Sequence, residues 1–385
     1  MSREVTVVGA GLGGLVAAAT LAEAGVPVRL LEAKPDPGGR GTSLDADHRA
    51  NWGPHVLYAN GTLWKWLDAR GLGEPAARAA RAAVRFRYRG ALHRMPPVQA
   101  AAAAMVARSR RAPDDVSFRD WVRSMTGEAS AEALCSWPGP LTFHHDPGEL
   151  AASFVQGRLH QVTRMPPVPR YIRGGWRSMI DRLVGYCVGL GVRIEYDSLV
   201  RALPEAPTVL AMKLESAARL LGDDTLTWTG SQCVAIDLGI RARRGDVYVC
   251  FDLDEAGWAA AYSYADPSLA PTGQHLVQAQ IGIRPGESVD DAAGRLEALL
   301  DQAYPDWRSR TTWRRRLRLV DQTGAIDLPG TSWRDRPATQ RGPGVHVVSD
   351  KSRAPGLLGE VAFHAALEVA HDLVEQVGAG TARRR

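Results

Sequence analysis

The sequence predicts an α/β protein in which a Rossmann-like nucleotide-binding domain is interleaved with a second, α+β domain. Three observations support this prediction. Residues 5–31 follow the order strand, glycine-rich turn, helix, strand. Two later apolar strands, at residues 208–211 and 345–348, are placed to return to the same sheet. The long stretches between these returns have helical and alternating patterns of their own, so we expect them to form the second domain.

Composition excludes several other classes of protein. The chain has 385 residues, of which 45% are hydrophobic and 23% charged, as in globular proteins and unlike disordered, collagen or coiled-coil chains. The 47 basic and 42 acidic residues give a formal charge of +5, which is too small and too dispersed to indicate a partner nucleic acid. No apolar run is long enough to span a bilayer, whereas contact with a membrane surface stays open.

The four cysteines give no sign of a disulfide framework or a sulfur-rich metal site. They lie far apart and form no C-x-x-C pair, so a reducing cytoplasm is the expected compartment. They are Cys135, Cys187, Cys233 and Cys250.

The first motif follows the strand predicted at residues 5–8. It reads G-x-G-x-x-G and precedes an alanine-rich helix predicted at residues 15–24. We expect Gly9 to make the tight turn, Gly11 to let the backbone approach a pyrophosphate, and Gly14 to let the helix pack closely on the strand. The amides at the start of the helix then face the anion. The residues expected at the dinucleotide are Gly9, Gly11, Leu12, Gly13 and Gly14.

A carboxylate closes the second strand, predicted at residues 28–31. Glu32 lies eighteen residues past Gly14, where an acid binds the ribose diol of an adenosine and repels a 2′-phosphate. Ala33 and Lys34 continue the same site. Together with the glycine-rich turn, Glu32 predicts a bound adenine dinucleotide.

Two further motifs, G-G-R at residues 38–40 and G-P-H at residues 53–55, follow within the next twenty-five residues. With them, the sequence resembles the flavoprotein superfamily of amine oxidases, phytoene desaturases, protoporphyrinogen oxidases and Rab GDP-dissociation inhibitors. It is most similar to phytoene-desaturase-like bacterial oxidoreductases. The resemblance implies an FAD-binding domain of the three-layer ββα type. The residues it adds to the FAD site are Gly38, Gly39, Arg40, Gly53, Pro54 and His55.

Arg40 is expected to hold charge near the phosphates or the flavin ring. For His55 two interpretations stay open, because the imidazole either takes part in catalysis or merely packs while the backbone contacts the cofactor.

The middle of the chain carries the second part of the resemblance. Residues 171–188 are similar to the family's G-G-x-x-x-L-x-x-x-L helix, with Met179 and Leu183 at the leucine positions. A strand predicted at residues 192–196 follows. The resemblance implies that Val200 contacts the adenine side through its backbone and that the next strand, ending at Ala211, leads back under the cofactor.

The third part lies near the C-terminus, after the strand at residues 345–348. The resemblance implies that Asp350 binds the ribityl chain or phosphate. It also implies a helix, predicted from residue 355 to residue 373, whose first amides meet the pyrimidine edge of the flavin. Ser349 stands where glycine is usual, which leaves the backbone approach there uncertain. The helix residues expected at the flavin are Gly356, Leu357 and Leu358.

The domain division follows from these three parts. The FAD-binding domain is predicted to comprise residues 1–60, 170–221 and 330–385, and the substrate domain residues 61–169 and 222–329. The first insertion is predicted to be largely helical, with helices at residues 100–107 and 116–124. The second is predicted to form a sheet above the flavin, with strands at residues 234–238, 246–252 and 275–283 and a helix at residues 289–304.

The predicted function is FAD-dependent oxidation, in which FAD accepts a hydride from a fairly apolar or amine-bearing small molecule. Such chemistry does not require a dedicated acid or base, and the only catalytic candidates are His55 and Trp333. For Trp333 two interpretations stay open, because it either forms part of an aromatic cage or packs within the strand pairings of the substrate domain. The absence of lysine between Lys213 and Lys351 disfavours an amine oxidase. FAD is expected to bind non-covalently, because no cysteine follows Cys250.

Two alternatives and one possible metal site remain. Gly53-Pro54-His55 also resembles the G-P-H of UDP-galactopyranose mutases, flavin enzymes without net redox change, and a non-catalytic carrier like the GDP-dissociation inhibitors keeps the same fold. The run His144-His145-Asp146 is interpreted as a structural loop and no metal is predicted, because adjacent histidines rarely chelate one ion.

Overall fold

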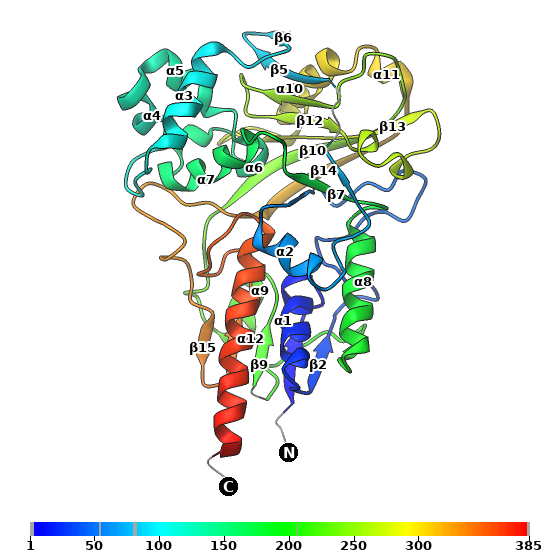
Figure 1. The fold of residues 1–385 in the computed structure, drawn as a ribbon, viewed down its shortest axis with the longest axis vertical. Helices are drawn as coiled ribbons and strands as arrows, with labels where there is room; N and C mark the ends of the chain where they lie inside the picture. Colours follow the sequence, from blue (N-terminus) through cyan, green and yellow to red (C-terminus); the bar gives the residue numbers. More distant parts are fainter. Residues whose placement is uncertain (1–3, 54, 80–82, 206, 383–385) are drawn as a thin grey trace.

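The structure, a computed structural model, describes residues 4–53, 55–79, 83–205 and 207–382. It has a lower part around a six-stranded sheet and an upper part in which a helical cap lies beside a seven-stranded sheet (Figure 1). No helix in the described ranges is long and apolar enough to cross a membrane.

The six-stranded sheet brings together segments that are far apart in the sequence. Its order is β15-β16-β9-β1-β2-β8, and all neighbours are parallel except β15 and β16. The predicted returns of the chain to one sheet are therefore confirmed. The strands are β1 (Val5–Val8), β2 (Val28–Leu31), β8 (Arg193–Glu195), β9 (Thr208–Leu210), β15 (Gln340–Gly342) and β16 (Val345–Val347).

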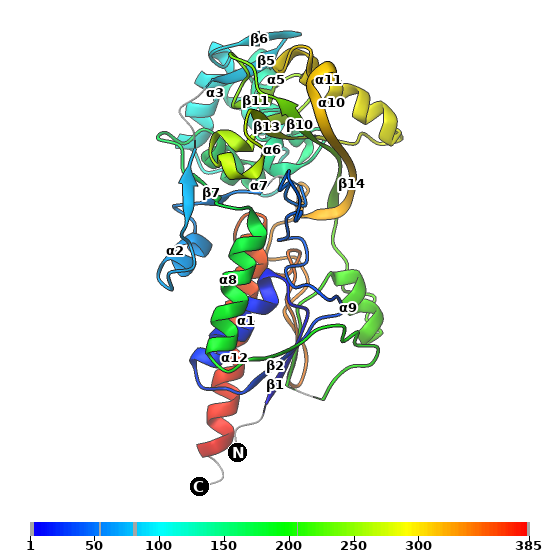
Figure 2. The same ribbon diagram turned by 90° about the vertical axis from the view of Figure 1, so that its right-hand side faces the viewer.

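Helices cover both faces of this sheet (Figure 2). On one face α1 (Leu12–Glu23) packs against α8 (Trp176–Gly189) and α12 (Gly359–Ala382), and on the other lies α9 (Leu214–Leu221). Met179 and Leu183 of α8 are fully buried in this core, as the leucine-position pattern predicts.

The final helix begins later and runs further than predicted. The prediction of residues 355–373 is wrong at its start, because Gly356 and Leu358 have φ values of +114° and +55°, which no helical residue adopts. The helix α12 therefore starts at Gly359.

The seven-stranded sheet has the order β14-β10-β13-β12-β11-β5-β6. Its three predicted strands and its helix, α10 (Val289–Ala303), are present. The longest strand, β14, is not predicted, nor is the contribution of the first insertion through β5 and β6. The strands are β5 (Val84–Tyr88), β6 (Ala91–His93), β10 (Gly230–Arg241), β11 (Val249–Asp252), β12 (Trp258–Ala261), β13 (Gln274–Gly282) and β14 (Thr311–Ala325).

The cap is helical, as predicted. Its helices are α3 (Val98–Ser109), α4 (Phe118–Thr126), α5 (Glu128–Cys135), α6 (Gly139–Thr142) and α7 (Ala152–Val162). The two parts are joined by a small antiparallel sheet of β3 (Leu57–Tyr58), β7 (Pro169–Ile172) and β4 (Ala76–Arg78). Helix α2 (Thr62–Asp68) lies beside this sheet. Helix α11 (Trp307–Arg310) lies at the far end of the seven-stranded sheet.

Candidate cofactor and substrate site

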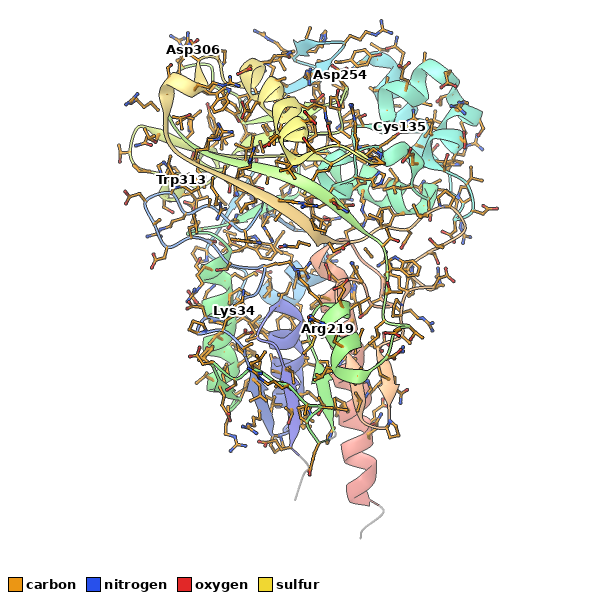
Figure 3. All side chains as sticks on the ribbon, turned by 180° about the vertical axis from the view of Figure 1, so that it is seen from behind. Lys34, Cys135, Arg219, Asp254, Asp306 and Trp313 are labelled. Carbon is orange, nitrogen blue, oxygen red and sulfur yellow. The ribbon has the colours of Figure 1, made fainter. Side chains whose placement is uncertain are left out.

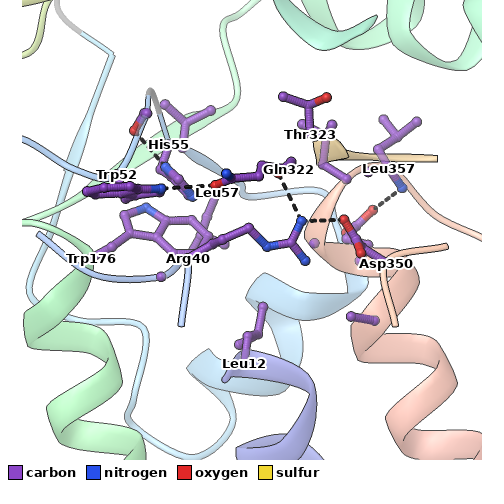
Figure 4. Close-up of a pocket in the computed structure, with 18 of the residues that line it drawn as sticks. Leu12, Arg40, Trp52, His55, Leu57, Trp176, Gln322, Thr323, Asp350 and Leu357 are labelled. Carbon is purple, nitrogen blue, oxygen red and sulfur yellow. Dashed lines mark hydrogen bonds and ion pairs between the residues drawn. The ribbon is translucent and has the colours of Figure 1, made fainter. Parts of the chain in front are cut away.

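One cavity of about 1600 Å³ runs from the glycine-rich turn of the lower part to the large sheet and the cap. Its volume exceeds the roughly 300–1,000 Å³ of ordinary small-molecule sites. The cavity therefore has room for a cofactor and a second molecule. Figure 4 shows its middle, where the two parts of the protein meet.

The three glycines of the turn have different surroundings. A Cβ on Gly9, which has a φ of +105°, would lie 2.3 Å from the carbonyl oxygen of Ala211. A Cβ on Gly14 would lie 1.9 Å from the carbonyl oxygen of Gly9, so Gly14 serves packing and does not line the cavity. Around Gly11 nothing lies within 4 Å of such a Cβ, and its backbone faces open space.

Glu32 is buried and fixed at the end of β2. Its carboxylate accepts hydrogen bonds from the backbone N–H of Ala10 at 2.7 Å and of Lys34 at 3.0 Å. These bonds tie the acid to the glycine-rich turn, and Glu32, Ala33 and Lys34 all line the cavity. Lys34 and Arg219, which also lines it, lie at the level of the N-terminal end of α1 (Figure 3).

Arg40 connects two distant segments at the centre of the cavity. Its guanidinium donates to Asp350 Oδ2 at 2.6 Å and to the carbonyl oxygen of Gln322 at 2.9 Å (Figure 4). Burial favours the neutral acid, but the adjacent Arg40 cation holds the pKa of Asp350 below its usual value. Both residues are predicted at the cofactor from the sequence, but their pairing is not.

Ser349, which replaces the usual glycine, still lines the cavity. Its N–H donates to Ser352 Oγ at 3.0 Å, and its own hydroxyl donates to Asp350 Oδ1 at 3.2 Å. The hydroxyl therefore helps to orient the carboxylate.

His55 lies beside two tryptophans on the opposite side. Its Nδ1 is 2.7 Å from the carbonyl oxygen of Gly53, and its ring centroid is 4.6 Å from that of Trp176. Because a carbonyl only accepts, Nδ1 carries the proton and Nε2 keeps a free lone pair. Burial, with a smaller contribution from the Arg40 charge, lowers the pKa of His55 to about 4, so the ring is neutral near pH 7. Trp52 donates through Nε1 to Gln322 Oε1 at 3.1 Å.

Most other predicted FAD-site residues also line the cavity. Gly356 does not line it. Glu360 fills the space beside Gly356, because a Cβ added to Gly356 would lie 2.8 Å from the Cβ of Glu360. Pro54 lies outside the described residues. The lining residues in this group are Leu12, Gly13, Gly38, Gly39, Gly53, Val200, Ala211, Leu357 and Leu358.

The upper end of the cavity is aromatic, which the sequence analysis does not predict. The Tyr171 and Tyr248 hydroxyl oxygens lie 2.5 Å apart, and the Tyr171 and Tyr262 rings pack edge to face. These rings come from separate strands and loops, and each alone has the pattern of an ordinary core residue. The aromatic residues of this end are Phe86, Trp137, Phe143, Tyr171, Tyr248, Phe251, Trp258 and Tyr262.

Trp333 is not part of this wall, so the structure gives no support to its prediction as a cage residue. It lies outside β14, in the loop that follows this strand, where the Arg334 guanidinium is 4.5 Å from its ring centroid. It is not among the described residues that line the cavity.

The loop after α6 places His144, His145 and Glu149 together, with one potential ligand atom of each within 4.8 Å of the others. The His144 Nδ1 is already engaged, 2.8 Å from the carbonyl oxygen of Asp146. The absence of a metal site here stays a prediction.

The lower part of the cavity fits FAD chemically. The backbone is bare at Gly11, a fixed carboxylate lies at Glu32, and the centre has the partly buried Arg40–Asp350 pair. Glu32 would bind the adenosine ribose, and the glycine-rich turn the pyrophosphate.

Comparisons with known proteins agree with this geometry. Residues 7–69 match the model of the NAD(P)-binding Rossmann-like domain. No curated protein matches the sequence at a significant level.

Several solved structures have a similar fold along almost the whole chain. An oxidoreductase from Methanosarcina mazei has a TM-score of 0.77 at 18% identity, covering 96% of this chain and 100% of that chain. A cyclohexylamine oxidase from Brevibacterium oxydans has a TM-score of 0.72 at 14% identity, covering 98% and 100%. A reduced UDP-galactopyranose mutase has a TM-score of 0.69 at 12% identity, covering 98% and 96%.

The predicted fold class is thus confirmed. The chain has the fold of these solved structures, and its residues 7–69 form a Rossmann-like nucleotide-binding domain.

Proposed function

We propose that the protein is an oxidoreductase that binds FAD non-covalently and removes a hydride from a small molecule. The observation that carries this proposal is the single cavity, which has a dinucleotide site at one end and an aromatic chamber at the other. When bound, FAD supplies the hydride acceptor. The chain itself has to bind the two molecules, orient them and exclude water.

Each of these tasks has residues suited to it. Glu32 and the glycine-rich turn fix the adenosine end, and Arg40 and Asp350 the middle of the cofactor. The walls formed by β10–β14 and the cap shield the reacting region from water, which protects a reduced cofactor from side reactions. His55 is neutral and keeps a free Nε2, so it is available to accept a hydrogen bond or a proton there.

The visible spectrum of the purified protein tests the cofactor. Flavin bands should be present and acid precipitation should release the colour into the supernatant, because the attachment is non-covalent. Colour that stays in the washed pellet would contradict this attachment, and a colourless protein that takes up no added FAD would support the carrier alternative. Anaerobic addition of substrates should then bleach the bands.

A mutase is the second candidate, because a UDP-galactopyranose mutase shares the fold and the G-P-H motif lines the site through Gly53 and His55. The redox state that supports turnover separates the two. An oxidase or dehydrogenase works from the oxidised flavin, whereas turnover that requires prior reduction would favour the mutase.

The domain division is part of the same proposal. We assign residues 1–60, 170–221 and 330–385 to FAD binding, and residues 61–169 and 222–329 to the substrate. The six-stranded sheet draws every strand from the first group, and the seven-stranded sheet every strand from the second.

A further inference from the structure

The charged residues along the cavity are unevenly distributed. We call the part lined by the cap, by β7 and by the seven-stranded sheet down to Leu319 the upper chamber. The acidic residues of the cavity wall, Glu32, Asp350 and Glu360, all lie below it. Among the described residues of the upper chamber, the only charged side chains are Arg94 and Arg164. A cation in this chamber would therefore find no described counter-charge on its walls.

The remaining walls suit a flat, conjugated molecule. Eight aromatic rings line the chamber, among them Phe86 and Phe251, which stack with centroids 5.5 Å apart and an interplanar angle of 20°. Trp137 meets Phe86 edge to face at 5.4 Å. Aromatic faces and edges such as these favour another planar ring system in offset or edge contact.

The two arginines begin the same five residues, R-M-P-P-V, at 94–98 and 164–168. Both side chains are exposed where they reach the cavity, and within the described chain neither has an ion-pair partner. In each copy two prolines stand two and three residues after the arginine, and they restrict the backbone conformation of this segment. A guanidinium with free N–H groups matches the two oxygens of a carboxylate.

The sequence around these two arginines is also basic. Residues 76–113 contain nine arginines and residues 150–180 contain five, with no aspartate or glutamate in either segment. These fourteen positive charges exceed the net +5 of the chain, so the rest of the protein carries 5 − 14 = −9. Some of the fourteen are neutralised, as Arg87 is by Asp252, whereas Arg94 and Arg164 are not. One-signed charge around a cleft raises the local concentration of the opposite ion.

We propose that the substrate is a carboxylate with a flat, conjugated body. The body packs among the rings of the upper chamber, and Arg94 and Arg164 hold the carboxylate at the rim. This inference rests on the proposed function, because it takes the upper chamber as the substrate site. It favours an anion over the amine-bearing substrate that the sequence analysis allowed.

The test compares three probes with the same ring and chain but different charge. They are pyrenebutyrate, its neutral amide and the corresponding pyrenebutylamine, titrated into FAD-loaded protein by fluorescence at low salt. The carboxylate should bind about tenfold more tightly than the amide, since charge-assisted hydrogen bonds contribute about 1.5–3 kcal/mol and each 1.4 kcal/mol is a factor of ten. The amine should bind most weakly. The advantage of the carboxylate should shrink as salt is raised.

Arginine variants assign the effect to its residues. The double variant Arg94→Gln/Arg164→Gln should weaken the carboxylate to the level of the amide and leave the amide unchanged. Arg244→Gln is the matched control, because Arg244 is exposed and lies outside the lining of the cavity. Equal binding of all three probes, tightest binding of the amine, or an equal effect of the control variant would overturn the inference.

The result separates this inference from the proposed function, because the titration measures binding without turnover. If the flavin is bound and is bleached by oxidisable compounds while the probes show no preference for the carboxylate, the substrate class is wrong and the proposed function stands. If the preference follows the two arginines but no compound bleaches the flavin, the anion site stands and the oxidation is wrong.

Discussion

Two single residues at the site, Glu32 and His55, have a role in the stability of the fold in addition to the role predicted for them at the cofactor. Glu32 is predicted as the ribose ligand, yet in the structure its carboxylate also accepts two backbone N–H groups and so stabilises the turn that is predicted to face the pyrophosphate. His55 is predicted with two open interpretations, and its burial as a neutral ring links its protonation to the stability of the fold.

Replacing Glu32 with alanine should yield largely apo protein. Two charge-assisted hydrogen bonds to the ribose are worth about 1.5–3 kcal/mol each, so FAD affinity should fall by roughly two orders of magnitude or more. The ratio of flavin to protein absorbance after purification measures this. Glu195→Ala, which removes a half-exposed acid on the neighbouring strand β8, is the control and should keep its flavin. A full flavin complement in Glu32→Ala would show that Glu32 is not the ribose ligand.

Replacing His55 with glutamine should reduce the acid sensitivity of the apo protein. The unfolded chain takes up a proton at the ordinary His pKa of 6.5, whereas the folded chain does so only near about 4. Stability therefore falls as pH falls between these values. From about pH 7 to about pH 5, His55 accounts for a loss of about 2 kcal/mol. Urea unfolding at the two pH values should show that loss in the parent and in the exposed-residue control His371→Gln, but not in His55→Gln.

At the level of elements, the turn between β1 and α1 shows how much the sequence predicts. The glycine motif, the strand on each side and Glu32 are all predicted, because these features are local and the turn requires glycine. Strand β14 is not predicted, because three consecutive arginines at residues 314–316, followed by Arg318, give it a polar composition. The aromatic chamber could not be predicted either, since strand pairings alone bring its residues together.

The turn also allows two glycines to be compared by the same substitution. Gly11→Ala should fold with nearly unchanged stability, because its Cβ meets nothing within 4 Å, but should bind FAD poorly since the methyl group enters the space facing the cofactor. Gly9→Ala should be destabilised by at least about 3 kcal/mol. The φ of +105° alone costs about 1–3 kcal/mol for a residue with a Cβ, and the added Cβ would also lie 2.3 Å from the carbonyl oxygen of Ala211. Thermal unfolding and flavin content measure the two effects. A strongly destabilised Gly11→Ala would contradict this assignment.

At the scale of the whole molecule, one buried ion pair lies near the junction of the two parts. Arg336 forms a two-point ion pair with Asp327 at 2.8 and 3.0 Å, with both side chains almost fully buried. Asp327 also accepts, through its backbone carbonyl, the N–H of Ala151 at the start of α7. Asp327 thus links Arg336 to the cap.

Replacing Arg336 with methionine should therefore destabilise the fold by about 3–5 kcal/mol, because it leaves the Asp327 carboxylate buried without its partner. Arg334→Met, two residues earlier and exposed, is the control and should change stability by less than about 0.5 kcal/mol. Denaturant unfolding of both variants measures the difference. If the double variant Arg336→Met/Asp327→Leu is no more stable than Arg336→Met, the unpaired charge is not the cause.

The order of strands in the six-stranded sheet has a consequence for biosynthesis. Strand β9 pairs with β1 on one side and with β16 on the other, and β16 begins 345 − 210 = 135 residues after β9 ends. While the ribosome makes those residues, the far edge of β9 has no strand to pair with, and α12, which packs on α1, does not yet exist. Unpaired edges in growing chains are sites of aggregation. The proposed FAD site, although its first motif is encoded first, is completed only by residues near position 350, so FAD binding would not stabilise the early folding of the nascent protein.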